Sequence, residues 1–231
     1  MNKRSGYIVS KYVAKPHLIR GYKYDLRLYV LVTSFEPLKI YLFQEGLVRL
    51  ATVPYSTSKS SLKQRFIHLT NFSVNKKSEA YVKNTNSATQ PEEPAFESKL
   101  NLTQLRAEYE RIGVNYDELF EKIKEILIKT LLSVENPLVT GMSGIKSKKS
   151  CFEVYGFDIL IDANFRPWLL EVNVSPSLSS SSPMDKYIKT LLLSDSFYLC
   201  GLQMFDRKML EKQKALIDKQ RLLGFDSSKS N

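Results

Sequence analysis

Apolar and polar residues alternate with a period of two over residues 22–35, which predicts a long β-strand. One face of this strand is apolar and the other is largely charged: Leu26, Leu28, Val30 and Val32 against Lys23, Asp25, Arg27 and Tyr29. The β-branched and aromatic run 7–14 predicts a strand that Pro16 ends. The segments LKIYLF and LVRLATVPY predict a hairpin, with Gly46 of the intervening QEG at its turn.

Helical periodicity dominates the middle of the chain. A helix is expected to start near Leu102, and a stronger one covers residues 116–134, with Asn115 as its N-cap and Pro137 at its end. The runs CFEVYGFDILID and RPWLLEVNV then predict two strands, and the short joint ANF makes them an antiparallel pair. Helices are expected over residues 184–200 and 203–223.

Composition divides the chain into a body and two accessory segments. Residues 77–99 are polar with two prolines and are expected to form a flexible insert in a body that covers residues 1–201. Residues 202–231 are expected to form a basic helical tail. A solvated helix and a helix that touches a microtubule are both consistent with that tail.

The bulk composition excludes some classes of protein and leaves others open. Of the 231 residues, 43% are hydrophobic and 25% charged, which is typical of a soluble globular protein. We expect no membrane span and no secretory signal, and the two cysteines favour a reducing compartment. The formal net charge of +10 favours an acidic partner, whether nucleic acid, an anionic membrane, an acidic protein or a nucleotide.

The last pair of strands carries polar residues among apolar ones. Glu171 and Asn173 are two residues apart and share a face of one strand, and Asp158 lies on the other. A buried carboxylate needs a partner or a metal, and three oxygen-bearing side chains suit Mg²⁺. A strand face that is simply exposed to solvent is the alternative interpretation.

A charged strand face and a polar loop could bind an anionic ligand. Lys23, Asp25 and Arg27 share the face described above, and Arg49 follows on a neighbouring strand. Arginine suits phosphate or carboxylate, although pairing among these charges on a wet surface is also consistent with the pattern. The loop HLTNFSVNKK offers further hydrogen-bond donors, from Thr70, Asn71, Asn75, Lys76 and Lys77.

The familiar short motifs of other enzyme classes are missing. The sequence has no G-x-G-x-x-G, no P-loop and no C-x-x-C, and no motif of the common nucleic-acid-binding kinds. We therefore expect no nucleic-acid partner. His17 and His68 have no partner at a metal-binding spacing, so we interpret both as structural or surface residues.

Four segments in order resemble the tubulin tyrosine ligase-like family, and its polyglutamylase branch more closely than the tyrosine ligase itself: KYVAKPHLIRGYKYDLRLYVLV, IYLFQEGLVRLATVPY, FIHLTNFSVNK and FEVYGFDILIDANFRPWLLEVNVSPSL. The resemblance implies an ATP-grasp fold, which holds ATP between two sheets and joins a carboxylate to an amine. We therefore expect an α+β fold, with a largely antiparallel sheet and packed helices, that forms the C-terminal part of an ATP-grasp domain.

The resemblance also implies roles for individual residues. Lys11, Tyr12 and Val13 are similar to the hinge segment beside adenine, where Ser10 replaces a frequent glutamine. By the same resemblance, Lys23 and Asp25 bind ATP, Asp25 through the ribose. Arg27 and Arg49 take part in catalysis and substrate binding, and Thr70 and Asn71 bind substrate. Asp158, Glu171 and Asn173 bind Mg²⁺.

The implied reaction is an ATP-dependent ligation of free glutamate to the acidic tails of tubulin through an acyl phosphate. Two alternatives stay open: glycine or tyrosine as the donor, or a non-catalytic fragment that binds microtubules. The implied location is the cytoplasm and cytoskeleton, including the cilium or basal body. The chain begins almost at the hinge segment, so we expect a partial catalytic domain with little or no activity by itself.

Overall fold

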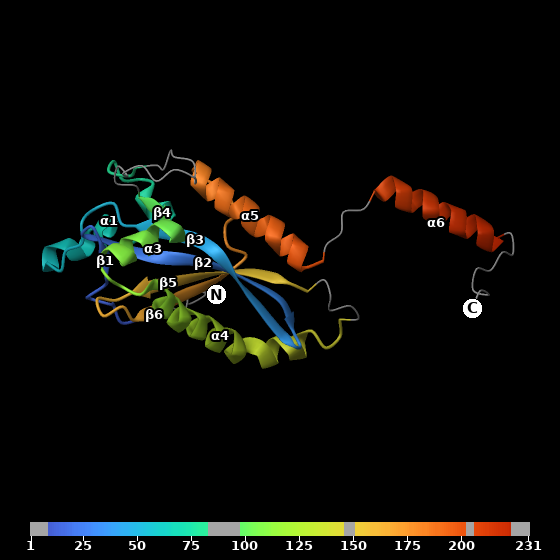
Figure 1. Cartoon of the computed structure of the whole chain (residues 1–231), viewed down its shortest axis with the longest axis horizontal. Coiled ribbons are helices and arrows are strands. Elements are labelled where there is room, and N and C mark those ends of the chain that lie inside the picture. The colour runs from blue at the N-terminus through green and yellow to red at the C-terminus, as the bar shows by residue number, and fades with distance from the viewer. Residues whose placement is uncertain (1–8, 83–97, 146–150, 202–205, 223–231) are drawn as a thin grey trace, which may run out of the picture.

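A six-stranded sheet forms the centre of the structure (Figure 1). The computed structural model describes residues 9–82, 98–145, 151–201 and 206–222. The strands pair in the order β4-β3-β2-β5-β6, β1 pairs with β2, and every pairing is antiparallel, which confirms the predicted α+β fold and sheet type. The strands are β1 (Leu18–Ile19), β2 (Tyr22–Phe35), β3 (Leu38–Leu50), β4 (Lys99–Asn101), β5 (Glu153–Ile161) and β6 (Pro167–Val174).

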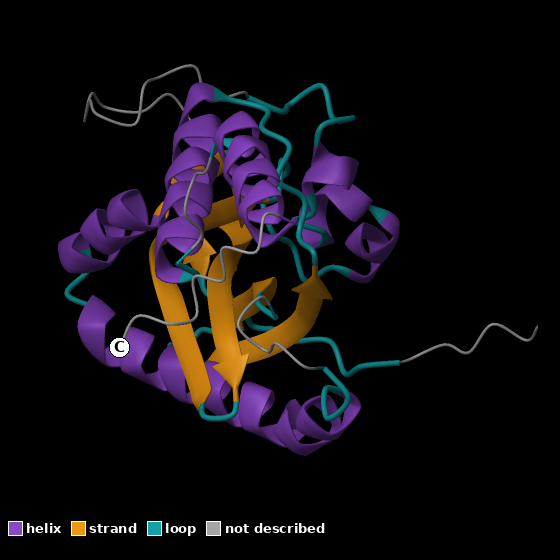
Figure 2. Ribbon diagram, turned by 90° about the vertical axis from the view of Figure 1, so that its right-hand side faces the viewer, coloured by secondary structure: helices purple, strands orange, loops and turns teal. Residues whose placement is uncertain are grey.

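Helices lie on both sides of this sheet (Figure 2). The main core joins one face of the sheet to α3 and α4, whereas α5 packs on the opposite face. Asn115 accepts a hydrogen bond from the backbone N–H of Glu118 and caps α4, as predicted. The helical elements are η1 (Lys59–Lys63), α1 (Arg65–His68), α2 (Phe72–Asn75), α3 (Leu102–Arg111), α4 (Tyr116–Gly141), α5 (Pro183–Leu199) and α6 (Arg207–Leu222).

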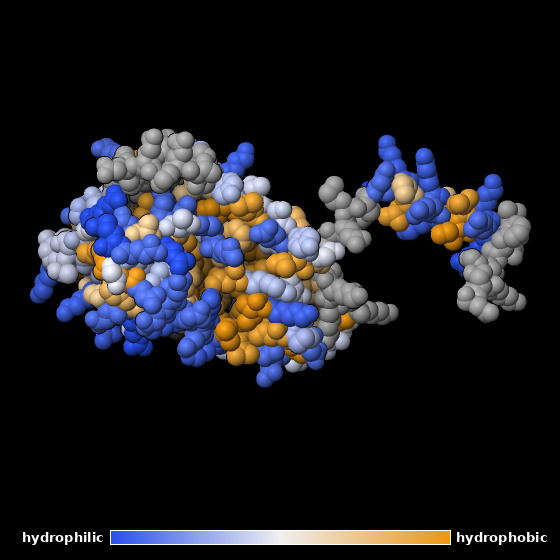
Figure 3. All heavy atoms as spheres, in the orientation of Figure 1, coloured by the Kyte–Doolittle hydropathy of each residue, from blue (hydrophilic) through white to orange (hydrophobic). Residues whose placement is uncertain are grey.

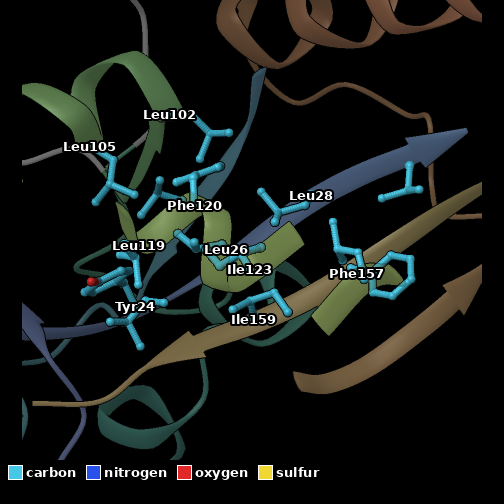
Figure 4. Packing of buried hydrophobic residues seen from close by; sticks show 14 of the residues in the cluster. Tyr24, Leu26, Leu28, Leu102, Leu105, Leu119, Phe120, Ile123, Phe157 and Ile159 are labelled. Carbon is cyan, nitrogen blue, oxygen red and sulfur yellow. The ribbon is translucent and has the colours of Figure 1, made fainter. Parts of the chain in front are cut away.

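The apolar face of β2 lies in the main core, as the alternation predicts (Figure 4). Leu26 and Leu28 are fully buried there against the α4 stripe that contains Ile123 and Leu127. Burial of such a side chain stabilises the fold by about 1.5–3 kcal/mol. This core fixes which way β2 faces, and therefore where its charged side chains point.

The charged face of β2 is also enclosed, because α5 covers part of it. Tyr29 and Leu47 pack there against three residues of α5: Met184, Ile188 and Leu192. Asp25 is only 2% exposed on this side of the sheet. The interpretation of this face as a wet strand surface is therefore wrong.

The predicted hairpin turn at Gly46 is wrong, because β3 is one continuous strand and Gly46 pairs with Leu28 inside it. A Cβ atom at Gly46 would lie 2.7 Å from the carbonyl oxygen of Arg27 and 3.2 Å from Cδ1 of Leu102. The preceding Glu45 accepts a hydrogen bond from the backbone N–H of Leu102 at the start of α3. Gly46 thus permits a close approach, and the chain turns at residues 36–37 instead.

Two further predicted boundaries differ from the structure. Pro137 lies inside α4, which continues for one more turn to Gly141. Of the strand predicted over 7–14, residues 9–14 are irregular and residues 7–8 lie outside the described part. The long neighbours of β2, β3 and β5, come from later in the sequence, and the short strand β1 pairs with its start, so segment 9–14 has no place beside it.

The interior of the predicted insert 77–99, residues 83–97, lies outside the described part of the chain. Backbone hydrogen bonding joins Val82 and Ser98 on either side of it, and Lys99 begins β4 as a buried residue. In the predicted tail 202–231, the described residues form α6, which is exposed along its whole length and stands apart from the body in Figure 1. Of the helices that the structure describes, none is long and apolar enough to cross a membrane.

Candidate active site

Four charged residues from three strands meet on the face of the sheet that α5 covers. The strand register places Asp25 directly opposite Arg49, and Arg27 directly opposite Asp158. Directly opposed residues of antiparallel strands project to the same side of the sheet. The side chains that the sequence pattern proposed separately therefore form one group, at the middle of the sheet.

The two arginines share the two aspartates through a network of charged hydrogen bonds. Arg27 donates to Asp158 from Nε at 2.5 Å and from Nη2 at 3.1 Å. Arg49 donates to Asp25 from Nε at 2.9 Å and also from Nη2, which reaches Asp158 at 2.8 Å. The planar guanidinium groups hold both carboxylates in a fixed geometry.

Asp158 and Arg49 keep their charges in this network despite burial. Burial by itself raises the pKa of Asp158, but hydrogen bonds from Arg27 and the charge of Arg49 lower it below its usual value. Burial by itself lowers the pKa of Arg49, and the charges and hydrogen bonds of Asp25 and Asp158 raise it above its usual value. Asp158 and Arg49 are therefore ionised at neutral pH.

Glu171 and Asn173 border this network on β6. Glu171 lies opposite Asp158 in the strand register, and Asn173 lies opposite Gly156. Asn173 donates from Nδ2 to Glu171 at 3.1 Å, while Glu171 is exposed and makes no ion pair with any lysine or arginine that the structure describes. The structure thus brings together on one face the three residues predicted to bind a metal.

The donor set of Asp158, Glu171 and Asn173 fits a hard cation. Two carboxylates and an amide oxygen are ligands that Mg²⁺ prefers, with water and phosphate oxygens completing its octahedron. Asp158 already accepts three N–H groups, and a carboxylate offers about four acceptor positions, so it retains room for one more contact. Within the described residues, no group of three or more His, Cys, Asp or Glu side chains is placed to hold a metal ion.

Lys23 extends the charged face toward the predicted hinge segment. Its ammonium donates to the backbone oxygen of His68 at 2.9 Å and to the hydroxyl of Tyr12 at 3.3 Å, and lies 4.6 Å from the Tyr12 ring centre. Burial lowers the pKa of Lys23, against the opposing charge of Asp25. The structure therefore brings Tyr12 to Lys23, whereas Lys11 is exposed and Val13 half-buried in the same irregular segment.

The loop with Thr70 and Asn71 is fixed by the side chain of Asn75. Asn75 is 1% exposed and donates to the backbone oxygens of Leu69, at 2.7 Å, and Asn71, at 3.2 Å. Its own oxygen accepts the N–H and hydroxyl of Thr52, at 3.1 and 3.0 Å. The loop is thereby tied to Thr52, just after the end of β3 and close in sequence to Arg49.

Three further charged residues, which the sequence pattern did not reveal, lie beside Arg49. Lys99 pairs with Arg49 in the register of β3 and β4, lies 4.0 Å from the ring centre of Phe72, and contacts Asp185 at 3.4 Å. Asp185 is 1% exposed and also forms an ion pair with Lys189 at 2.8 Å. The sequence did contain one signal for two of them: Asp185 and Lys189 are four residues apart in α5, next to its apolar stripe.

The serine-rich loop after β6 crosses this face and is held at both ends. A Cβ atom at Gly156 would lie 2.8 Å from Cβ of Pro176 and 3.2 Å from Cδ of Arg27, so the loop begins close against the site. At its other end, Asp185 accepts the backbone N–H of Ser181 at 3.0 Å. The segment that follows Glu171 and Asn173 therefore begins close to Arg27 and ends at Asp185.

Comparison with known proteins gives this arrangement a family. The profile of the tubulin-tyrosine ligase family matches residues 1–209. The chain belongs to the tubulin-tyrosine ligase family. The family assignment confirms the resemblance that the sequence segments indicated, and it covers every residue of the charged face.

Curated members of the tubulin-tyrosine ligase family are similar over most of the chain. Tubulin monoglutamylase TTLL4 of Mus musculus is 46% identical over 202 residues, which are 86% of this chain and 16% of that protein. Tubulin polyglutamylase TTLL5 of Mus musculus is 40% identical over 225 residues, 97% of this chain and 16% of that protein. Tubulin polyglutamylase ttll-4 of Caenorhabditis elegans is 39% identical over 196 residues, 84% and 31% respectively. The chain thus spans about one sixth to one third of the length of these relatives.

Proposed function

We propose that this chain carries the nucleotide- and metal-binding part of an ATP-dependent ligase that adds glutamate to the acidic tails of tubulin. The chain belongs to a family named for tubulin modification, and the relatives described above are named tubulin glutamylases. Those names support glutamate as the donor over glycine or tyrosine. They also support tubulin as the acceptor and the cytoskeleton as the site of action. A location at the cilium or basal body is part of the proposal.

The observation that carries this proposal is the charge balance of the enclosed face. Five cationic side chains stand there against three buried carboxylates and the exposed Glu171 at the border, an excess of one positive charge: Lys23, Arg27, Arg49, Lys99 and Lys189 against Asp25, Asp158, Asp185 and Glu171. Buried charge is costly unless an opposite charge compensates it. A phosphate or carboxylate ligand supplies that compensation, and the face is therefore built for an anionic substrate.

The proposed division of labour follows from the positions of the side chains. The hinge segment 11–13 would contact adenine, and Asp25 would accept the ribose hydroxyls while Lys23 meets phosphate. Asp158, Glu171 and Asn173 would hold Mg²⁺, which supplies neutralisation of phosphate charge when it is bound. ATP would supply the phosphoryl group that turns the acceptor carboxylate into an acyl phosphate. This ATP-grasp arrangement is part of the proposal.

The arginines position the reacting groups and neutralise developing charge. Arg27 and Arg49 are fixed by Asp25 and Asp158, so they need no reorganisation when an oxyanion forms nearby. The loop with Thr70 and Asn71 would hold the free glutamate whose amine attacks the activated carboxylate. The protein thus contributes position and electrostatics, and no covalent intermediate on a side chain is required.

Labelled amino-acid incorporation into tubulin tests the proposal. We would assay the longest product of the gene with ATP, Mg²⁺ and labelled glutamate, glycine or tyrosine, and compare Glu171→Gln with Glu153→Gln. Glu153 is a half-exposed residue at the start of β5, away from the charged network, and makes a matched control. We expect glutamate to be incorporated, Glu171→Gln to lose at least tenfold, and Glu153→Gln to match the wild type. Preferred incorporation of glycine or tyrosine would exclude glutamate as the donor, and undiminished activity of Glu171→Gln would exclude its role as a metal ligand.

A further inference from the structure

A hollow of about 420 Å³ lies outside the charged face, between α1, α2 and the segment after β3. Its apolar lining comes from Val53, Phe66 and Val74, and its cationic lining from Lys63, Arg65 and Lys77. The two other lining residues are uncharged, so no carboxylate contributes to it. The volume lies toward the lower end of the range of about 300–1,000 Å³ that binding pockets occupy, enough for one or two side chains.

The cations of this hollow are exposed and have no carboxylate partner among the residues that the structure describes. The lysines of α4 behave differently, since Lys122, Lys124 and Lys129 each pair with a glutamate of the same helix. On the face shown in Figure 3, the end of the molecule that bears α1 is predominantly hydrophilic. The hollow therefore combines three available positive charges with an apolar lining.

The hollow adjoins the loop that we assign to the amino-acid substrate. Arg65 and Phe66 lie on α1, and Val74 lies on α2, the two short helices that flank Thr70 and Asn71. Asn75, which ties that loop to Thr52, directly follows Val74. A segment bound in the hollow would consequently lie beside the predicted substrate loop without occupying the charged face.

We propose that this hollow binds an acidic segment of the target protein, with its carboxylates at Lys63, Arg65 and Lys77 and an apolar side chain against Phe66 and Val74. The inference rests on the proposed function, because it assigns a second contact to the acidic substrate of that reaction. Charge complementarity selects an acidic peptide, and the apolar lining favours a segment that mixes glutamates with an apolar residue. The contact would hold the target while its tail reaches the arginines.

Direct binding of a fluorescent peptide tests the hollow without requiring ligase activity. The probes are a glutamate-rich peptide with one phenylalanine, the same peptide with serine in place of phenylalanine, and a single-stranded oligonucleotide of similar charge. The test variant is Lys63→Gln, Arg65→Gln and Lys77→Gln combined, and the control is Lys122→Gln, Lys124→Gln and Lys129→Gln combined. Both sets remove three positive charges from exposed side chains, so they change the net charge equally.

We expect the hollow variant to bind the phenylalanine peptide roughly tenfold more weakly, since three exposed ion pairs at about half a kcal/mol each give this factor. The control should stay within about twofold of the wild type, and the wild type should prefer the phenylalanine peptide to the serine peptide. Equal weakening in both variants, or none in either, would overturn the proposal. An equal loss of peptide and oligonucleotide binding, specific to the hollow variant, would show a general anion surface and would also overturn it.

The same variants separate this inference from the proposed function. In the glutamate assay, the hollow variant should raise KM for the acidic substrate and leave KM for ATP unchanged. A protein that binds the peptide through the hollow but incorporates no glutamate would refute the proposed reaction and leave the binding surface intact. If the protein incorporates glutamate and the hollow variant has an unchanged KM for the acidic substrate, the proposed reaction stands and the binding role of the hollow is refuted.

Discussion

Asp158→Asn is expected to destabilise the protein severely, because it removes the negative charge that two buried guanidinium groups share. The side chains of Asp158, Arg27 and Arg49 are 2%, 13% and 8% exposed, so solvent cannot replace the lost charge. Removal of one partner from a buried pair costs about 3–5 kcal/mol. Because Arg49 keeps Asp25 and asparagine keeps one oxygen acceptor, we place the loss near the lower limit, about 3 kcal/mol.

Urea unfolding at pH 7 measures this loss of unfolding free energy. With a slope of roughly 2–3 kcal/mol per molar, the midpoint should fall by about 1 M. Asp117→Asn is the matched control, since its ion pair with Arg106 is exposed and should contribute less than about 1 kcal/mol. A loss below about 1 kcal/mol in Asp158→Asn would refute the account of the network.

The same experiment repeated at low pH tests the sign of the electrostatic term. The pKa of Asp158 is lowered in the folded state, so its contribution is fully present above the unfolded pKa of about 3.9. That contribution is lost as the pH falls through the folded pKa. The difference between wild type and Asp158→Asn should therefore shrink below about pH 4. A difference that stays constant from pH 7 to pH 3 would mean that the charge of Asp158 is not what stabilises the fold.

Two other substitutions test the support around the site. Asp185→Asn leaves Lys99 and Lys189 without their buried carboxylate, so thermal unfolding should show a Tm lower by about 6–12 °C. Asp195→Asn, on the exposed side of α5, is the control and should change the Tm by less than about 2 °C. Equal Tm shifts in the two variants would contradict the role of Asp185 as a buried partner of both lysines. Gly46→Ala should lower the unfolding free energy by about 1–3 kcal/mol, because the added Cβ would lie against the backbone oxygen of Arg27. Gly141→Ala, which has open space around the added Cβ, should not lower it. An unchanged unfolding free energy in Gly46→Ala would show that β3 can shift without an energetic cost.

Periodicity predicts the parts of the fold whose side chains alternate between an apolar and a polar environment. It identifies β2, because the leucines and valines of one face enter the main core while the charged residues project to the other. It identifies α4 for the same reason, through the stripe that contains Leu119 and Ile123. The antiparallel pairing of β5 with β6 follows from the few residues between them.

The errors arise where a residue serves the tertiary structure. Gly46 is typical of a turn in the sequence, but in the fold its missing Cβ admits Arg27 and Leu102. Segment 9–14 has the composition of a strand, yet the sheet offers it no partner. The helix-breaking signal of Pro137 is likewise insufficient to end α4, which continues to Gly141.

The candidate site is predicted in its residue types and only partly in its arrangement. The register of β2, β3 and β5 brings Asp25, Arg27, Arg49 and Asp158 together, which the sequence pattern left open. Lys99 could not be found, because its neighbours Arg49 and Asp185 are distant in sequence and meet it only through β4 and α5. Such contacts depend on how separate elements pack, and local patterns do not record that.

Calorimetric titration of ATP in the presence and absence of Mg²⁺ tests most directly whether the enclosed charged face is a nucleotide site. Lys23→Met removes a cation that has no carboxylate partner among the described residues, and Glu171→Gln removes an exposed carboxylate, so neither is expected to unfold the protein. We expect the longest product of the gene to bind one ATP, Mg²⁺ to strengthen this binding, and each substitution to weaken it at least tenfold, while Glu153→Gln has no effect. ATP binding that is equally tight in Lys23→Met, Glu171→Gln and the wild type would contradict this expectation.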